Sequence, residues 1–209
     1  MRQNRYRFQE ARKKLRLIKP TFLIVNGGVE TEYNYFVAFS KELHPHADVH
    51  VLKAGRDVVS LVKKAMAKVE QRKKEDVTPY TRAWCVVDVE VAESVRKDIQ
   101  NAQALIRKQR ADMELCLSNP CFEVWFLAHY VRSDRAFHNC NAVIDDLKRY
   151  MTDYEKSLEG IYAHLAPKLP DAIKNARACL SPSLSALDKN SSTEIYRMME
   201  ALLPSTKEN

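Results

Sequence analysis

Two carboxylates, Asp88 and Glu90, form the most informative chemical pair in this sequence. They lie at the end of Arg82 to Val89 (RAWCVVDV), an apolar run that is typical of a buried strand. Side chains at positions i and i+2 of an extended segment point the same way, so both carboxylates can face one hard cation such as Mg²⁺ or Mn²⁺. The structural alternative is that acidic residues at strand ends commonly form turns and caps.

Further acidic side chains are expected near the same edge. Glu30 and Glu32 follow a second apolar run, Phe22 to Asn26, and the Gly27-Gly28 turn after it. Glu123 comes just after another expected strand, although the helix dipole also favours a glutamate in a first helical turn. Ligands of open α/β sheets bind at the carboxyl ends of the strands. Carboxylates that converge there suit metal-assisted phosphoryl transfer, in which a cation neutralises developing charge.

The elements that must position these residues alternate along the chain. Strands are expected near 22–26, 48–54, 82–89 and 114–118, and helices near 31–43, 57–74, 92–110 and 123–130. This order predicts an α/β fold with a mainly parallel, helix-covered central sheet and right-handed crossovers. From Asn141 onward the pattern predicts helices only, near 141–151, 158–179 and 193–203, with Pro167 and Pro170 interrupting the middle one. The stretch 191–194 resembles a helix N-cap.

The charge of the chain bears on its partners. The 209 residues carry a formal net charge of +7, and basic residues are concentrated between Arg2 and Lys19. Lys and Arg neutralise phosphates, so nucleic acid is a candidate partner, while a solvated basic tail accounts for the same charge. No apolar run approaches the roughly 20 residues of a membrane helix. The polar N-terminus argues against a secretory signal, so we expect a cytoplasmic protein with no membrane partner.

Cysteines and other motifs exclude several classes of site. Cys85, Cys116 and Cys121 lie in apolar runs and are interpreted as core residues, whereas Cys140 and Cys179 receive no assignment. The odd number and the absence of CxxC spacing predict neither a disulfide framework nor a zinc knuckle. The sequence also lacks HExxH, GxSxG and GxxxxGK[ST], which argues against a zincin, a serine hydrolase and a mononucleotide-binding loop.

Three segments together resemble the RloB family of prokaryotic, defence-associated proteins. FLIVNGGVETEYNYF (22–36) is similar to the family's strand followed by an EGxxTExxYF corner, and WCVVDVE (84–90) to its strand ending in DxD. The most specific segment, LSNPCFEVWFLAHY (117–130), is similar to the SNPxFExWxLLHF signature. With DYEKSLEGIYAHL and NSSTEIYRMMEALL, which resemble the family's C-terminal helices, the likeness covers about residues 20 to 203.

The resemblance implies a Toprim-like sheet, in which a glutamate after the first strand acts in acid–base catalysis and a DxD pair holds Mg²⁺. The DxD positions fall on Asp88 and Glu90, but the position of the first-strand glutamate falls on Gly27. Three explanations are open: Glu30 or Glu32 replaces that glutamate, the chain is a catalytically silent relative that still binds nucleic acid, or the glycine is an engineered change. Glu32 matches the TE of the family motif and is the best substitute.

These observations give one main hypothesis, a Toprim-like, Mg²⁺-dependent nuclease of a prokaryotic anti-phage defence system that cleaves RNA, tRNA included, or DNA. The alternatives are a silent nucleic-acid-binding or regulatory subunit, with other subunits of a defence complex as partners, and a protein-interaction module that uses the helical tail. We expect a basic arm (1–19), a Toprim-like α/β domain (20–135) and a helical C-terminal extension (136–209). The predicted catalytic residues are Glu32, Asp88, Glu90 and Glu123, with Asp88 and Glu90 as metal ligands. The predicted substrate-binding residues are Lys53, Arg56, Asn119, Arg12, Lys13 and Lys14.

Overall fold

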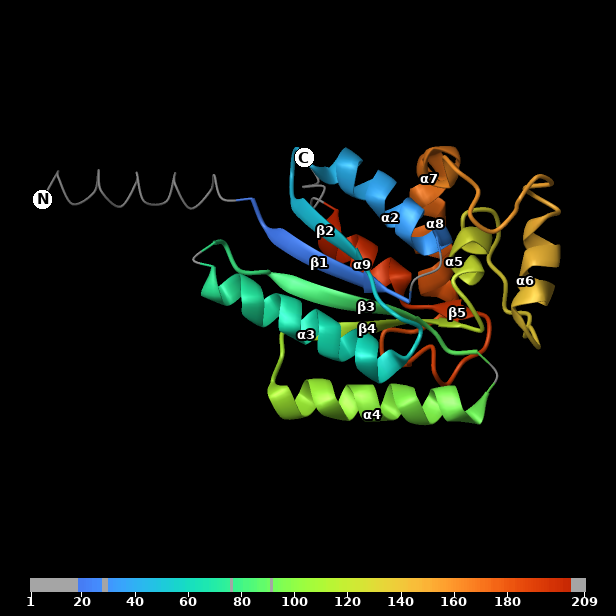
Figure 1. Ribbon diagram of the computed structural model, residues 1–209. Coiled ribbons are helices and arrows are strands. Elements are labelled where there is room, and N and C mark those ends of the chain that lie inside the picture. Colours follow the sequence, from blue (N-terminus) through green and yellow to red (C-terminus); the bar gives the residue numbers. More distant parts are fainter. Residues whose placement is uncertain (1–18, 28–29, 76, 91, 204–209) are drawn as a thin grey trace, which may run out of the picture.

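The computed structural model describes residues 19–27, 30–75, 77–90 and 92–203. Arg12, Lys13, Lys14 and most of the expected basic arm therefore lie outside the described residues. The described chain forms a five-stranded sheet of order β2-β1-β3-β4-β5 with helices on both faces (Figure 1). The predicted α/β class is confirmed, and the arrangement is consistent with a Toprim-like domain.

The elements follow the predicted alternation up to the end of the fourth strand–helix unit. The strands are β1 (Thr21–Asn26), β2 (Asp48–Lys53), β3 (Arg82–Asp88), β4 (Met113–Asn119) and β5 (Ser192–Thr193). The helices of the sheet region are α2 (Glu30–Leu43), α3 (Val58–Lys74), α4 (Glu93–Gln109) and α5 (Glu123–Ala128). The C-terminal part contains α6 (Cys140–Leu147), α7 (Ile161–Leu165), the 3-10 helix η1 (Ala166–Lys168), α8 (Leu169–Cys179) and α9 (Ile195–Leu202).

Strand register explains why the candidate site lies at one edge. The pairs β1–β2, β1–β3 and β3–β4 are all parallel, so their carboxyl ends meet at the same side. Asn26 at the end of β1 aligns with Val86, which places Asp88 two residues beyond the end of β1. Asp88 in turn aligns with Ser118 of β4. The end of β3 therefore projects beyond the end of β1 at the carboxyl end of the sheet.

The two faces of the sheet are covered differently. Helices α3 and α4 lie side by side on one face, while α2 and α9 cover the other, with α7 and α8 beyond them (Figure 1). Asp57 caps α3 by accepting a hydrogen bond from the backbone N–H of Ser60, as the sequence predicted. Trp84 and Trp125 are 2% and 0% exposed, which confirms their interpretation as core residues.

The prediction of helices alone after Asn141 was wrong at one point. Ser192 and Thr193 form β5, which pairs antiparallel with the end of β4. The hydroxyls of Thr193 and Ser118 are hydrogen-bonded at 2.8 Å, and the carboxylate of Glu194 accepts from the backbone N–H of Leu117 at 3.2 Å. The stretch interpreted as an N-cap does precede α9, whose N-cap is Glu194, and the Thr193 hydroxyl accepts from the backbone N–H of Ile195 at 3.2 Å. Contacts with residues some 75 positions away make Ser192 and Thr193 a strand as well.

One continuous apolar core includes residues from β1 to α9. Pro167 lies in η1 and Pro170 in the first turn of α8, so the expected long helix is divided where the prolines predicted. Among the described residues, no helix combines the length and the apolar character needed to cross a membrane. The C-terminal helices pack on the sheet domain and contribute side chains to its core.

Candidate functional site

Four carboxylates, here called the carboxylate cluster, gather at the carboxyl ends of the central strands. Glu32 lies in the first turn of α2, Asp88 ends β3, Glu90 follows it, and Glu123 begins α5. Glu32 and Glu123 are only 9% and 4% exposed, which is unusual for glutamate side chains. The fold therefore brings together the four predicted catalytic residues, which come from three separate segments of the chain.

A cleft of about 210 Å³ opens beside this cluster. Its wall includes Glu32, Asp88 and Glu90, together with Arg56 from the β2–α3 connection and Lys156 from the loop before α7. A second cleft of about 380 Å³ shares Asp88, Glu90 and Lys156 with the first. The cluster is thus reachable from solvent, and each approach passes a basic side chain.

Asp88 and Glu90 line the same clefts, but the backbone between them is not the extended strand that the sequence predicted. The strand ends at Asp88, and Glu90 has φ of +47°, so the segment turns there instead of continuing as an extended strand. The backbone N–H groups of Val89 and Glu90 donate to the carbonyls of Ser118 and Pro120 at 2.8 and 3.0 Å. These two hydrogen bonds hold Glu90 in a left-handed backbone conformation, which is energetically costly for a residue other than glycine. A strained, anchored turn presents both carboxylates.

The electrostatics of the cluster favour a cation. Burial, followed by repulsion from Glu32, Glu123 and Glu90, raises the pKa of Asp88 well above its usual value. Burial also raises the pKa of Glu32 to about 7, and repulsion from Glu123 adds to the effect. The Oε2 atom of Glu32 is buried and has no hydrogen-bond partner among the described residues. Because Mg²⁺ prefers oxygen ligands, a divalent cation fits this donor set.

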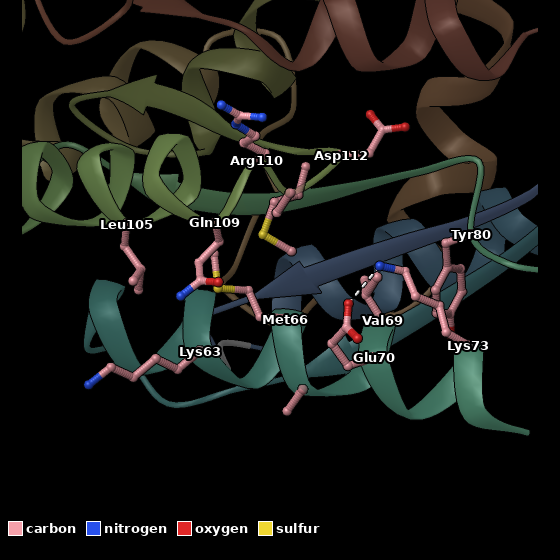
Figure 2. Close-up of a pocket in the computed structure, with 13 residues that line it drawn as sticks. Lys63, Met66, Val69, Glu70, Lys73, Tyr80, Leu105, Gln109, Arg110 and Asp112 are labelled. Carbon is pink, nitrogen blue, oxygen red and sulfur yellow. Dashed lines mark hydrogen bonds and ion pairs between the residues drawn. The ribbon is translucent and has the colours of Figure 1, made fainter.

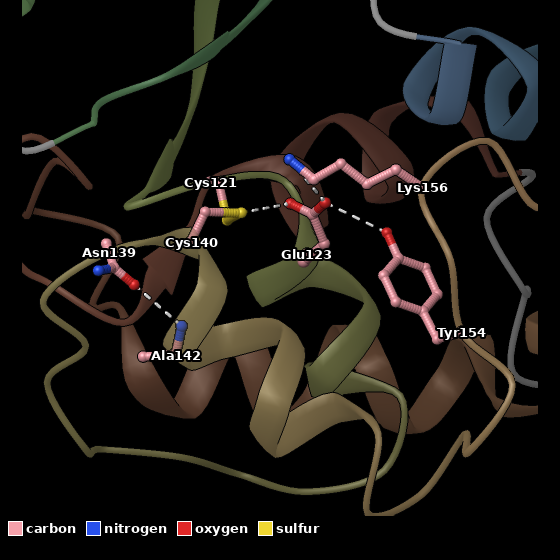
Figure 3. The surroundings of a disulfide bond; sticks show 7 residues. All are labelled: Cys121, Glu123, Asn139, Cys140, Ala142, Tyr154 and Lys156. Atoms are coloured by element: carbon pink, nitrogen blue, oxygen red, sulfur yellow. Dashed lines mark hydrogen bonds and ion pairs between the residues drawn. A yellow bond between two sulfur atoms is a disulfide. The ribbon is translucent and has the colours of Figure 1, made fainter.

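The two carboxylate oxygens of Glu123 contact different side chains, Oε1 that of Tyr154 and Oε2 that of Cys140 (Figure 3). Its Oε1 atom accepts a hydrogen bond from the Tyr154 hydroxyl at 3.2 Å and lies 3.7 Å from the ammonium of Lys156. The loop that carries these two residues is fixed to the start of α2, since the N–H of Ser157 donates to the Thr31 hydroxyl at 2.9 Å. Lys156 is therefore held over the cluster.

Lys156 and Tyr154 were not predicted as functional residues. They lie in a loop about 30 residues after Glu123, and no local pattern indicates that this loop folds back over α2. A signal was nevertheless present, because both belong to DYEKSLEGIYAHL, a segment that carries part of the family resemblance.

The other predicted residues occupy varied positions. Glu30 is exposed and does not line either cleft, whereas Gly27 lies in the wall beside Glu32. Lys53 is exposed at the end of β2, with its ammonium 4.5 Å from the centre of the Tyr33 ring. Asn119 is buried and donates its amide to the carbonyl of Ala186 at 2.8 Å. Of the predicted substrate-binding residues that the structure describes, Arg56 alone lines the clefts at the cluster.

Cys121 is buried in an apolar cluster, as predicted, but it forms a disulfide with Cys140 beside the carboxylate cluster, so the expectation of no disulfide was wrong for this pair. The two cysteines are 19 residues apart, Cys121 just before α5 and Cys140 at the start of α6, so no short spacing motif indicates the pair. Both line the second cleft together with Asp88 and Glu90. Cys85, Cys116 and Cys179 are free and buried.

Another cleft lies away from the carboxylate cluster, between α3 and α4. Figure 2 shows this space of about 560 Å³ between α3 and α4, near the start of β4. Its lining mixes apolar side chains such as Met66 and Leu105 with charges of both signs, including Lys63 and Glu70. It contains no group of converging carboxylates, so it offers no comparable chemistry.

Comparison with known protein families identifies the family of this chain. A family model described as RloB-like protein matches residues 22–202, which includes every member of the carboxylate cluster. The chain belongs to the RloB-like family. In the same comparisons no curated protein and no solved structure matched the chain. The RloB-like match covers both the sheet and the C-terminal helices, so Lys156 and Tyr154 fall within the family region as well.

Proposed function

We propose that this RloB-like protein is a Mg²⁺-dependent, Toprim-like nuclease of a prokaryotic anti-phage defence system that cleaves phosphodiester bonds of RNA or DNA. The observation that carries the proposal is the convergence of Glu32, Asp88, Glu90 and Glu123 beside a cleft that also presents Arg56 and Lys156. Acidic groups for a cation and basic groups for a phosphate are the two requirements of metal-assisted phosphoryl transfer.

Asp88 and Glu90 would hold the metal, because they are the two carboxylates shared by both clefts. Bound Mg²⁺ would neutralise charge on the phosphodiester and orient the attacking oxygen. Glu32 is suited to remove a proton from the attacking water, since its pKa of about 7 lies near neutral pH. Glu123 would complete the ligand shell or hold Lys156 in position.

The basic residues would bind the nucleic-acid backbone. Arg56 and Lys156 lie in the wall of the cleft, where they can contact the phosphate that reacts. Lys53 and the basic arm at residues 1–19 would contact phosphates further along the strand. Such contacts position the substrate without reading its sequence, so the site itself implies little base specificity.

The direct test is cleavage of labelled tRNA, single-stranded RNA and plasmid DNA in Mg²⁺ or Mn²⁺. Asp88→Ala should abolish cleavage of whichever substrate is cut, whereas Asp112→Ala, which removes an exposed carboxylate at the other end of β4, should retain it. If all three substrates stay intact, or if Asp88→Ala cuts as well as the unmodified chain, the nuclease proposal fails.

One observation favours a second candidate, a catalytically silent subunit that binds nucleic acid within a defence complex. The cleft wall contains Gly27 where the family resemblance places a catalytic glutamate, and glycine can neither transfer a proton nor bind a cation. This candidate predicts salt-sensitive binding that persists in Asp88→Ala. Binding that requires both Mg²⁺ and Asp88 would eliminate it.

A further inference from the structure

We infer that Cys121, Cys140 and Glu123 form a second metal site, specific for a thiophilic divalent cation such as Zn²⁺, when the disulfide is reduced. One ligand atom from each residue, two sulfurs and a carboxylate oxygen, lies within 4.8 Å of the others. Zn²⁺ is typically held by three or four such donors at about 2.0 to 2.3 Å. The inference concerns sulfur ligands, so it does not depend on nuclease activity.

The contact between Cys140 and Glu123 is the central observation. The Cys140 Sγ atom lies 3.1 Å from Glu123 Oε2, and Figure 3 shows the sulfurs facing that carboxylate. In the disulfide the sulfur carries no hydrogen, so this contact is not a hydrogen bond in the oxidised protein. In the reduced protein it becomes one, and a cation bound by both atoms would replace the thiol proton.

The second oxygen of Glu123 is already oriented by other groups. Oε1 accepts from Tyr154 and lies near Lys156, which leaves Oε2 directed at the cysteines. Metal-binding carboxylates are commonly fixed by hydrogen bonds of this kind to the oxygen that does not bind. The buried position of Glu123, 4% exposed, also makes a nearby positive charge favourable.

The surroundings leave access for a fourth ligand. Cys121 and Cys140 line the cleft of about 380 Å³, so a water molecule or a substrate atom can approach the three protein donors from solvent. Three protein ligands with one accessible position are typical of zinc sites with chemical roles, whereas structural zinc sites are closed. The two sites share Glu123 but differ in their other donors, because the cysteine sulfurs suit Zn²⁺ and Mg²⁺ avoids thiolates.

Reduction is required because a disulfide cannot bind zinc in this way. A dithiol reductant would transfer two electrons and two protons to the Cys121–Cys140 bond, breaking it and becoming a disulfide itself. Zn²⁺ binding would then release one proton from each thiol and form two zinc–sulfur bonds. The oxidised and reduced chains should therefore differ in metal preference without any substitution.

The experiment uses Co²⁺ as a coloured replacement for Zn²⁺, added to the full chain in excess Mg²⁺, which occupies oxygen sites but does not compete for thiolates. The reduced protein should bind one equivalent and show the near-ultraviolet thiolate-to-cobalt charge-transfer band, which added Zn²⁺ removes. The oxidised protein should show no band. An absent band in the reduced chain, or an equal band in the oxidised chain, overturns the inference.

Substitutions then identify the ligands. Cys121→Ser and Cys140→Ser should each weaken Zn²⁺ binding at least tenfold, measured by competition with a chromogenic chelator, whereas Cys179→Ser should match the unmodified chain. Glu123→Gln should keep the charge-transfer band and bind severalfold more weakly. Unchanged affinity in either cysteine variant overturns the site, and unchanged affinity in Glu123→Gln removes the carboxylate from it.

Discussion

Trp125 donates its indole N–H to the hydroxyl of Tyr35 across 3.0 Å. Both side chains are fully buried, and the bond joins α2, which carries Glu32, to α5, which carries Glu123. The two glutamates are 91 residues apart in the sequence, so a short contact of this kind is needed to hold them at one site. The carboxylate cluster depends on the packing of these two helices as much as on the strand ends.

Removing the Tyr35 hydroxyl tests that dependence. Tyr35→Phe leaves the Trp125 N–H buried without an acceptor, and such a group costs about 1–3 kcal/mol. We expect the free energy of unfolding in urea to fall by about that amount. Tyr150→Phe removes a hydroxyl from an aromatic side chain that is 46% exposed, and serves as the control. Equal stability of the Tyr35 variant and the unmodified chain would show that the bond contributes nothing.

The cluster should destabilise the metal-free protein. The raised pKa of Asp88 means that the folded state binds its proton more tightly than the unfolded state does, so ionisation at neutral pH costs folding free energy. Asp88→Asn should therefore raise the free energy of unfolding in EDTA by roughly 1–2 kcal/mol. The unmodified chain should gain thermal stability on addition of Mg²⁺, whereas the variant should not.

The exposed Asp112 provides the matched control for this measurement. Asp112→Asn should leave both the metal-free stability and the Mg²⁺-dependent increase in Tm unchanged. A destabilised Asp88→Asn in EDTA would mean that the carboxylate is already compensated within the folded chain. A Mg²⁺-dependent increase that survives in Asp88→Asn would remove Asp88 from the metal site.

The buried His129 should make the protein less stable as the pH falls, whereas the raised pKa of Asp88 has the opposite effect. Its imidazole is 2% exposed, Nε2 has no partner among the described atoms, and burial lowers its pKa to about 4. The folded state therefore excludes a proton that the unfolded state binds at about pH 6.5. Stability should fall as the pH drops from 6.5 to 4, by about 2 kcal/mol between pH 7 and pH 5.

Comparison with His129→Asn isolates this effect, because Asn retains a donor for the Trp125 carbonyl that His129 Nδ1 contacts. The raised pKa values of Glu32 and Asp88 act in the other direction, stabilising the fold as pH falls, and they are common to both chains. In urea unfolding at several pH values, the free energy of unfolding should fall more steeply with decreasing pH in the unmodified chain than in His129→Asn. Identical profiles would mean that His129 is solvated.

Sequence reasoning succeeded where the signal was local. Apolar runs followed by acidic turns identified β1 and β3 and the edge at which their carboxylates meet. It failed where distant contacts decide the structure. The polar pair Ser192 and Thr193 becomes a strand through its bonds to β4, and Lys156 reaches the site through a loop that packs on α2. Neither contact has a periodicity that a single sequence displays.

The departure at Gly27 gives the most informative substitution. A Cβ atom at Gly27 would meet nothing within 4 Å, and no left-handed backbone conformation is required there. A side chain can therefore be added without a clash, in the wall that Glu32 and Asp88 share. Gly27→Glu should bind Mg²⁺ roughly tenfold more tightly than Gly27→Gln, because an added carboxylate near the cation contributes about 1–2 kcal/mol.

The same pair of variants separates the two proposed functions. If Glu32 already acts as the base, the unmodified chain cleaves nucleic acid, and Gly27→Glu and Gly27→Gln change its rate without creating the activity. If the chain is a silent relative, cleavage should appear in Gly27→Glu and be absent from both the unmodified chain and Gly27→Gln. Equal Mg²⁺ affinity of the two variants, measured by calorimetry, would show that a side chain at position 27 points away from the cluster.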